Sequence, residues 1–293
     1  MQKALHRRHF TICAASLAVT AALPMLSISQ AFAQAAGGSA SFDHSHAALT
    51  ALLQKNVLVL NGGQASQVRY GSLAADRAAL KRYLDSLSNV TRASYNRFSK
   101  PQQMAFLINA YNAFTLELIL TRWPKLESIK DLGSVFSSPW KRKWVPLLGS
   151  TLSLDDIEHG MLRERGQFDD PRVHFGVNCA SIGCPALREE AFVASRLNAQ
   201  LDEQTQRFMA DRSRNRYQPG NTPGSGKLQV SKIFDWFGED FRLGHRGATS
   251  LPVFLAGHAD VLADAPVDRD RVRNAQADVS FMNYNWKLND VPG

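Results

Sequence analysis

A segment from Pro101 to Arg122 is apolar on nearly every face that a helix would present. Its apolar residues recur three and four positions apart, and others fill the remaining faces. A helix of this kind is buried in a core rather than laid on a surface. Pro101 suits the first helical turn, and Trp123-Pro124 would end the helix. We therefore expect the chain to fold around this one helix.

Two amides interrupt the apolar pattern of this helix. Asn109 and Asn112 are three residues apart, which places them on one helical face. A buried amide needs hydrogen-bond partners. Two interpretations stay open: the amides bond nearby backbone and fix the core, or they face an active site, where Asn112 could donate to an oxyanion.

A second helix is predicted from Ser153 to about Arg165. Ser153 is followed three residues later by Asp156, which is the capping-box pattern. Glu158 and His159 are adjacent in this helix. Adjacent helical side chains project about 100° apart, so the two cannot face one spot squarely.

The segment from Arg172 to Asn178 alternates apolar and polar residues and predicts a strand with His174 on its polar face. A loop over 179–183 follows, and Pro185 with acidic residues after it predicts a helix that ends near Phe192. Cys184 would then lie at a helix N-terminus, where the helix dipole lowers the pKa of a thiol from about 8.5.

The cysteines Cys179 and Cys184 carry the chemistry that this sequence suggests. One of them could be a nucleophile, with His174 or His159 as its base and Glu158 to orient the base. Alternatively, the pair could form a disulfide, because an exported protein meets an oxidising compartment. A Cys/His metal site is a third reading, but the histidines lack the usual ligand spacing, so no metal and no cofactor is predicted.

The first 33 residues have the three parts of a secretory signal. Arg7-Arg8 precedes an apolar stretch from Thr11 to Ile28, and Ala31-Phe32-Ala33 is a small-residue cleavage site. The arginine pair resembles the twin-arginine class of signals. We expect cleavage after Ala33, a periplasmic or secreted protein, and no transmembrane segment in the mature chain.

The rest of the chain predicts an α+β fold: a single, mainly helical domain with a small sheet. Residues 34–98 read as a linker followed by N-terminal helices, and residues 99–293 as the main domain. Beyond the segments above, the expected elements are helices over 43–60, 73–87, 197–212 and 249–262 and a strand or turn over 227–230.

The charge of the chain limits its partners only mildly. The net charge is +8, and Lys3, Arg7 and Arg8 of the signal contribute three of these charges, which leaves about +5 for the exported chain. A weak attraction to an anionic envelope polymer is compatible with this value. The basic run Lys141–Lys143 lies between tryptophans but is too short to predict nucleic-acid binding.

Residues 99–289 resemble the family of the domain of unknown function 547. The segments that carry the resemblance are Phe106–Ala113, Leu154–His159, Arg172–Pro185, Ser231–Phe241 and Tyr284–Asn289. The resemblance implies a fold and a motif set but no substrate. Family members with serine at the position of Cys184 favour Cys179 as the nucleophile, whereas the helix-dipole argument favours Cys184, so both stay candidates. Asn285 stands where the family often has aspartate. The motif order is also similar, by analogy alone, to papain-like and transglutaminase-like folds.

Two functional hypotheses follow. The first is a thiol-dependent hydrolase or acyl transferase of the periplasm that acts on a peptide or an envelope polymer. The second is a non-catalytic envelope-binding domain in which Cys179 and Cys184 form a structural disulfide. They differ in whether the cysteines, the histidines and Glu158 converge in one cleft.

Overall fold

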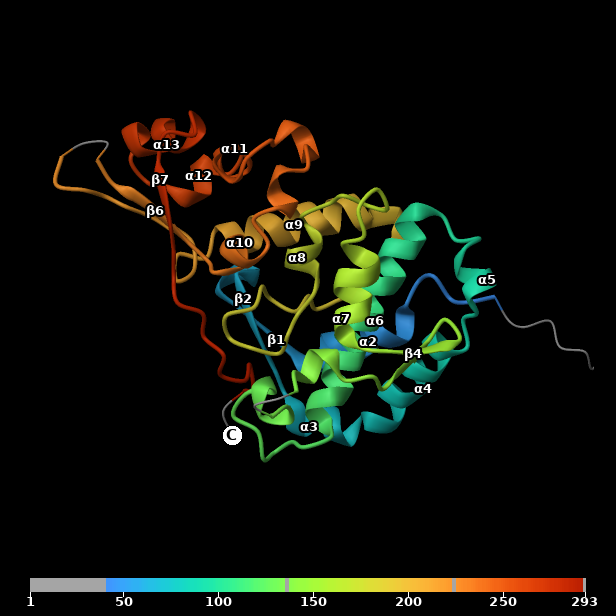
Figure 1. Cartoon of the computed structure of the whole chain (residues 1–293). Coiled ribbons are helices and arrows are strands. Elements are labelled where there is room, and N and C mark those ends of the chain that lie inside the picture. Colours follow the sequence, from blue (N-terminus) through green and yellow to red (C-terminus); the bar gives the residue numbers. More distant parts are fainter. Residues whose placement is uncertain (1–40, 135–136, 223–224, 292–293) are drawn as a thin grey trace, which may run out of the picture. The chain divides into compact units, whose positions relative to one another are not determined.

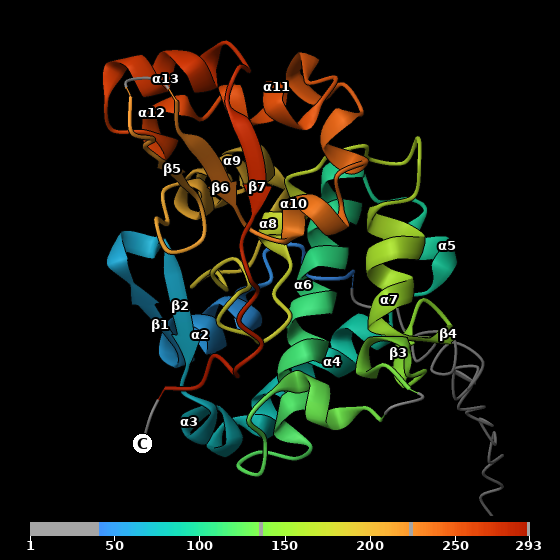
Figure 2. The ribbon, with the colours of Figure 1, turned by 60° about the vertical axis from the view of Figure 1, so that its left-hand side comes forward.

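The helix α6 (Lys100–Leu120) lies at the centre of the fold, as Figure 2 shows. The computed structural model describes residues 41–134, 137–222 and 225–291, and the predicted signal peptide, residues 1–33, lies outside them. Residues Phe42–Gly293 form one compact unit. Every residue of α6 from Gln103 to Leu120 is buried, which confirms the predicted core helix.

Side chains at the start of α6 determine where the helix begins. The backbone N–H of Gln102 donates to the Ser99 hydroxyl, and the Gln102 side chain accepts from the Ser99 N–H. This capping box satisfies two backbone donors that a helix otherwise leaves unpaired. Pro101 in the first turn has no N–H that would need a partner.

Helices from the N-terminal half pack on α6 and share its apolar core. Leu80, Tyr83, Leu84 and Leu87 of one helix face this core at helical spacing, as their periodicity predicted. The helices of this half are α2 (Ala47–Asn56), α3 (Tyr70–Ala75), α4 (Arg77–Ser88) and α5 (Arg92–Tyr95). The helix expected over 43–60 is therefore shorter, because its last four residues form a strand.

The sheets of the described residues are small. Two are antiparallel hairpins, and in the third the central strand β6 pairs antiparallel with β5 and parallel with β7. The strands are β1 (Val57–Leu60), β2 (Ala65–Val68), β3 (Val145–Leu147), β4 (Ser150–Leu152), β5 (Arg216–Gln218), β6 (Lys227–Val230) and β7 (Asp278–Phe281). Many helices with small sheets confirm the mixed α+β class.

A second apolar core lies beside the first, and the short helix α8 (Val173–Gly176) contributes to both. Val173 and Val177 pack in the core around α6, whereas Phe175 packs with other phenylalanines in the second core. Helices around the second core are α9 (Leu197–Met209), α10 (Ile233–Trp236), α11 (Leu251–Ala256), α12 (Ala259–Leu262) and α13 (Pro266–Arg273).

Two local predictions were wrong. The strand expected over 172–178 is the helix α8, and all of its residues are buried, so the alternation does not mark an exposed face. The helix expected from Cys184 to Phe192 is irregular backbone. Side chains bond its carbonyls instead: Asn178 donates to Pro185 O, and Gln204 donates to Ala186 O. Cys184 therefore has no helix dipole beside it.

The C-terminal segment after β7 returns along the molecule toward the first hairpin (Figures 1 and 2). It pairs with the cysteine loop at Ser181 and Leu288 and with β2 at Val68 and Asp290. Residues close to the end of the chain thus reach the loop that holds the cysteines.

Candidate functional site

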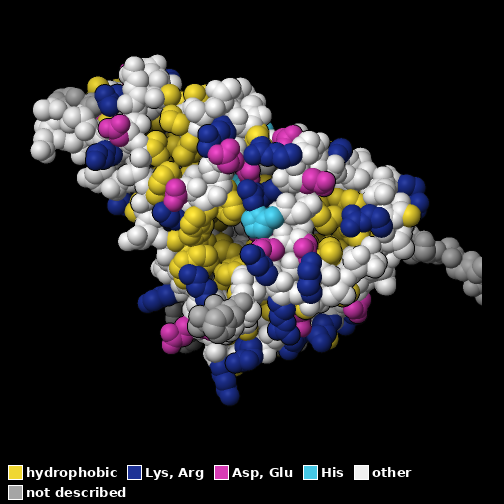
Figure 3. Space-filling model, in the orientation of Figure 1, with side chains coloured by type: hydrophobic (Ala, Val, Ile, Leu, Met, Phe, Trp, Pro, Cys, Tyr) yellow, Lys and Arg dark blue, Asp and Glu magenta, His cyan; other side chains and the backbone are white. Residues whose placement is uncertain are grey.

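A cavity of about 240 Å³ brings together five of the six residues singled out from the sequence. They come from α7 (Leu154–Ile157) and its continuation, from α8 and from the loop that follows it. Figure 3 shows hydrophobic side chains gathered where Figure 1 places α10 and the C-terminal segment, with a histidine at their edge. The five residues are Glu158, His159, His174, Cys179 and Cys184.

The two sulfur atoms at this cavity are joined in a disulfide between Cys179 and Cys184. Cys184 is buried, with 5% of its surface exposed, whereas Cys179 is half-buried. The Tyr284 hydroxyl lies 3.1 Å from the Cys179 sulfur and 3.2 Å from the Cys184 sulfur. Burial raises the pKa of Tyr284, so the phenol keeps its proton and can donate to a group at the sulfurs.

The loop between the cysteines is fixed by the C-terminal segment. The N–H of Ile182 donates to Lys287 O, and the N–H of Gly183 donates to Asn285 O. A side chain at Gly183 would begin 2.9 Å from the Tyr284 ring, so glycine is required for this close approach. The backbone bonds hold Tyr284 against the disulfide.

His174 is held by an acid that the sequence did not single out. Its Nε2 donates to Asp240 Oδ2 at 2.7 Å, and its ring stacks on Phe237 with centroids 4.2 Å apart. Arg163 Nε also donates to Asp240. Burial opposes ionisation of Asp240, but the hydrogen bonds from His174 and Arg163 outweigh it and hold the pKa of this carboxyl below its usual range.

Glu158 and His159 face different surroundings, as expected for neighbours on a helix. They begin the π-helical turn η4 (Glu158–Leu162), a form that is frequent at functional sites. Glu158 is 7% exposed and lies beside Tyr111. Burial, together with the charge of Glu158 and a side-chain hydrogen bond to it, raises the pKa of Tyr111. His159 is exposed, contacts Arg163 and lies 3.6 Å from Asp155.

Asn112 does not line this cavity. Its Nδ2 donates to Gly176 O, and its Oδ1 accepts from the Asn178 N–H. Asn109 bonds the backbone of Phe192 in the same way. Both amides therefore fix the core, which is the first of their two interpretations, and the oxyanion donor expected at Asn112 is absent from the cavity.

Several cavity residues were not found by sequence reasoning. Asp240, which bonds His174, comes from a segment that the resemblance includes but that offers no catalytic spacing. The aromatic residues come from separate helices, such as α6 and α10, and from loops. The closing motif from Tyr284 to Asn289 was the available signal for part of this set. The aromatic residues of the cavity are Tyr111, Trp140, Trp236, Phe237, Tyr284 and Trp286.

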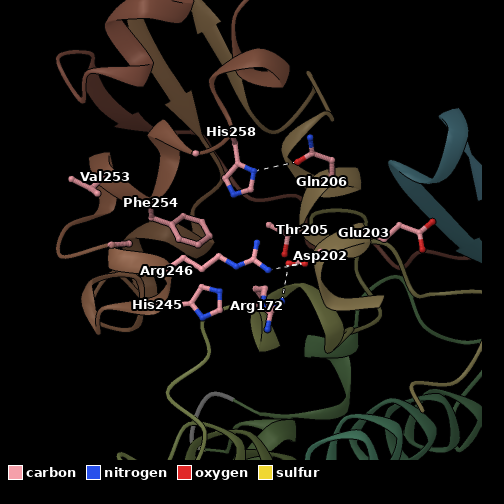
Figure 4. Close-up of a pocket in the computed structure, with 12 residues that line it drawn as sticks. Arg172, Asp202, Glu203, Thr205, Gln206, His245, Arg246, Val253, Phe254 and His258 are labelled. Atoms are coloured by element: carbon pink, nitrogen blue, oxygen red, sulfur yellow. Dashed lines mark hydrogen bonds and ion pairs between the residues drawn. The ribbon is translucent and has the colours of Figure 1, made fainter. Parts of the chain in front are cut away.

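A second, larger cavity of about 590 Å³ lies beside α9 and α11 (Figure 4). Its charged groups are paired: Asp202 accepts from both Arg172 and Arg246. The imidazole of His258 contacts Gln206, and burial lowers the pKa of His258 to about 4. None of the site residues expected from the sequence lines this cavity.

The described residues contain no group of His, Cys, Asp and Glu side chains that could hold a metal ion. In the same part of the chain, no helix is long and apolar enough to cross a membrane.

The family model described as protein of unknown function, DUF547, matches residues 95–209. Over this part of its length the chain resembles that family, which confirms the resemblance for α6, for the turn with Glu158 and for the cysteine loop. Asp240 and the C-terminal segment lie beyond the matched residues. No curated protein and no solved structure matches the chain.

Proposed function

We propose that the cavity is the active site of an exported cysteine-dependent hydrolase or acyl transferase, and that the disulfide is its oxidised resting form. The observation that carries the proposal is the convergence of Cys179, Cys184 and His174 on one cavity, with His174 bound to Asp240. A nucleophile, a base and an acid that orients the base form the usual arrangement for nucleophilic catalysis.

In this proposal a dithiol reductant first converts the disulfide to two thiols and becomes a disulfide itself. Cys179 is then the nucleophile, because it is more exposed than Cys184. His174 takes the thiol proton, and the sulfur bonds to the carbonyl carbon of an ester or amide. The bond to the leaving group breaks as His174 returns the proton, and water or an acceptor then releases the acyl group from Cys179.

Asp240 and Tyr284 support this chemistry. With Nε2 of His174 donating to Asp240, the lone pair lies on Nδ1, and the carboxylate stabilises the imidazolium that forms. The Tyr284 hydroxyl replaces Asn112 as the donor that can approach an oxyanion formed at Cys179.

The test of the active-site proposal is acyl-enzyme formation with an activated ester, followed by mass spectrometry. The reduced protein and the Cys184→Ser variant should carry the acyl group on Cys179, the variant without any reductant. Cys179→Ser should carry none, and His174→Gln should acylate at least 100-fold more slowly. Folded, reduced protein that stays unmodified would overturn the proposal.

A second candidate is the non-catalytic envelope-binding domain with a structural disulfide. The bond between Cys179 and Cys184 and its packing against the C-terminal segment favour this candidate. Cys179 would then resist mild reduction in the folded protein, and the Cys184→Ser variant would lose stability without gaining reactivity.

The proposal that the protein is exported depends on the signal-like sequence of residues 1–33. The mature protein should begin at Gln34, and replacing both Arg7 and Arg8 with lysine should block export by the twin-arginine route. N-terminal sequencing of the exported protein measures the first point. Unchanged export of the double variant would assign the chain to the general secretory route.

A further inference from the structure

Glu158 is a carboxylate without a cationic partner at the wall of the disulfide-lined cavity. It is 93% buried, since only 7% of its surface is exposed. Neighbouring acids are paired, Asp155 with His159 and Asp156 with Lys143, whereas no ion pair of the described residues includes Glu158. The Tyr111 side chain hydrogen-bonds Glu158, so this buried carboxyl group has a hydrogen-bond partner but no cation beside it.

Aromatic rings make up another part of the lining of this cavity, called here the aromatic wall. Trp286 has its centroid 4.5 Å from Tyr284, 5.6 Å from Trp236 and 5.7 Å from Trp140. Trp236 is 43% exposed although it is large and apolar. Tryptophan faces are the strongest aromatic binders of cations.

Two aromatic rings at this site already have a cationic side chain of the protein close to their faces. Lys130 places its ammonium 3.8 Å from the Trp286 centroid, and Arg163 lies 4.7 Å over Phe237. Lys141 also lines the cavity, but its side chain is exposed and forms no ion pair with Glu158 in the described part of the chain.

We infer that the cavity binds a substituted ammonium group, held between the aromatic wall and the Glu158 carboxylate. Aromatic side chains combined with a carboxylate are the chemistry that recognises such cations. An anionic ligand would meet Glu158 and Asp155 with like charge, and a neutral apolar ligand would leave Glu158 without a cation. As a substrate class, which rests on the proposed function, this means an ester or amide that carries an amine or quaternary ammonium group.

The test compares choline with its uncharged isostere 3,3-dimethyl-1-butanol on the oxidised protein, by calorimetry and tryptophan fluorescence. Choline should bind at least ten-fold more tightly than the isostere. Glu158→Gln should remove this difference, and Trp236→Ala should weaken choline binding at least five-fold. Glu203→Gln, a matched change at the second cavity, should leave both affinities unchanged.

Equal affinity of the two probes for the unsubstituted protein, or binding of neither, would overturn the inference even if Glu158→Gln failed to fold. The acylation test on Cys179 is independent of this result. If Cys179 is acylated but the protein does not prefer choline to its isostere, the cation site is wrong and the proposed hydrolase stands. Choline binding without acylation would remove the proposed hydrolase and keep the cation site.

Discussion

The two cavities described above differ in their lining and in how their charges are compensated. In the larger one, Asp202 bonds both Arg172 and Arg246, and Asp170 also bonds Arg172, so its charges are paired inside the protein. In the smaller one, Glu158 is buried without a cation, and a disulfide and a histidine face the same space. Volume alone would select the larger cavity, whereas chemistry selects the smaller.

The difference shows what separates a structural polar cluster from a functional one. Paired charges stabilise a fold and leave little for a ligand to gain. A buried carboxylate without a cation and partly exposed tryptophans cost stability, and such features persist where a ligand supplies the missing contacts. The predictions below change groups that contact residues of the smaller cavity, or groups that line the larger one.

The largest expected effect follows Asp240→Asn. The substitution leaves His174 and Arg163 without their shared carboxylate, which is only 10% exposed. Removing one partner of a buried ion pair costs about 3–5 kcal/mol of unfolding free energy. Urea unfolding at pH 7 measures this cost, and acylation of Cys179 should fall with it.

Asp202→Asn is the matched change in the larger cavity. Its carboxylate is 41% exposed, and Arg172 keeps a second partner in Asp170. The expected cost is below about 1 kcal/mol, as for exposed ion pairs. Equal costs for the two variants would mean that the pairing in the two cavities does not differ as described.

A smaller effect is expected from Gly183→Ala. The new methyl group would lie 2.9 Å from the Tyr284 ring and 3.0 Å from the Asn285 nitrogen, so the C-terminal segment must shift. Overpacking of this kind costs about 1–3 kcal/mol. Thermal unfolding measures the loss, and choline binding should weaken because Tyr284 and Trp286 move together.

The matched control for this change is Gly257→Ala at the larger cavity. Its nearest neighbour would be 3.5 Å away, an ordinary contact, and the glycine has a helical φ of −63°. A change within about 0.5 kcal/mol is expected. A larger loss here than at Gly183 would show that the close approach of Tyr284 is not what requires glycine.

The fold was predictable where local rules govern it. α6 and α9 have long apolar periodicity, and the capping box at Ser153 begins α7 as expected. The segment from 171 to 192 was not predictable in the same way. Its carbonyls are bonded by side chains such as Asn112 and Gln204, which are distant in the sequence, so neither alternation nor an N-terminal proline decides its conformation.

The residues of the site were predictable, or not, for the same reason. Glu158, His159, His174 and the cysteines lie within 27 consecutive residues, and residue type alone drew attention to them. Asp240 bonds His174 from a later segment, and the aromatic wall takes Trp140 from before this stretch and Trp236 from after it. No spacing rule connects residues that meet only through tertiary packing, so Asp240 could be found only once the chain was folded.

The smallest expected effect concerns pH and the larger cavity. Burial lowers the pKa of His258 from its ordinary value of 6.5 to about 4. The unfolded chain therefore takes up a proton first as the pH falls, and the free energy of unfolding decreases between pH 6.5 and pH 4. Partial access to solvent limits the loss to about 1 kcal/mol in total.

His46, whose pKa is also lowered by burial, adds a loss of the same sign, so only the difference between wild type and His258→Gln isolates His258. Urea unfolding at pH 7 and pH 4.5 should give a shallower decrease for this variant, while choline binding at pH 7 stays unchanged. If the variant loses as much stability as the wild type, His258 is protonated in the folded protein, and the larger cavity holds a free cation rather than the compensated cluster that distinguishes it from the smaller one.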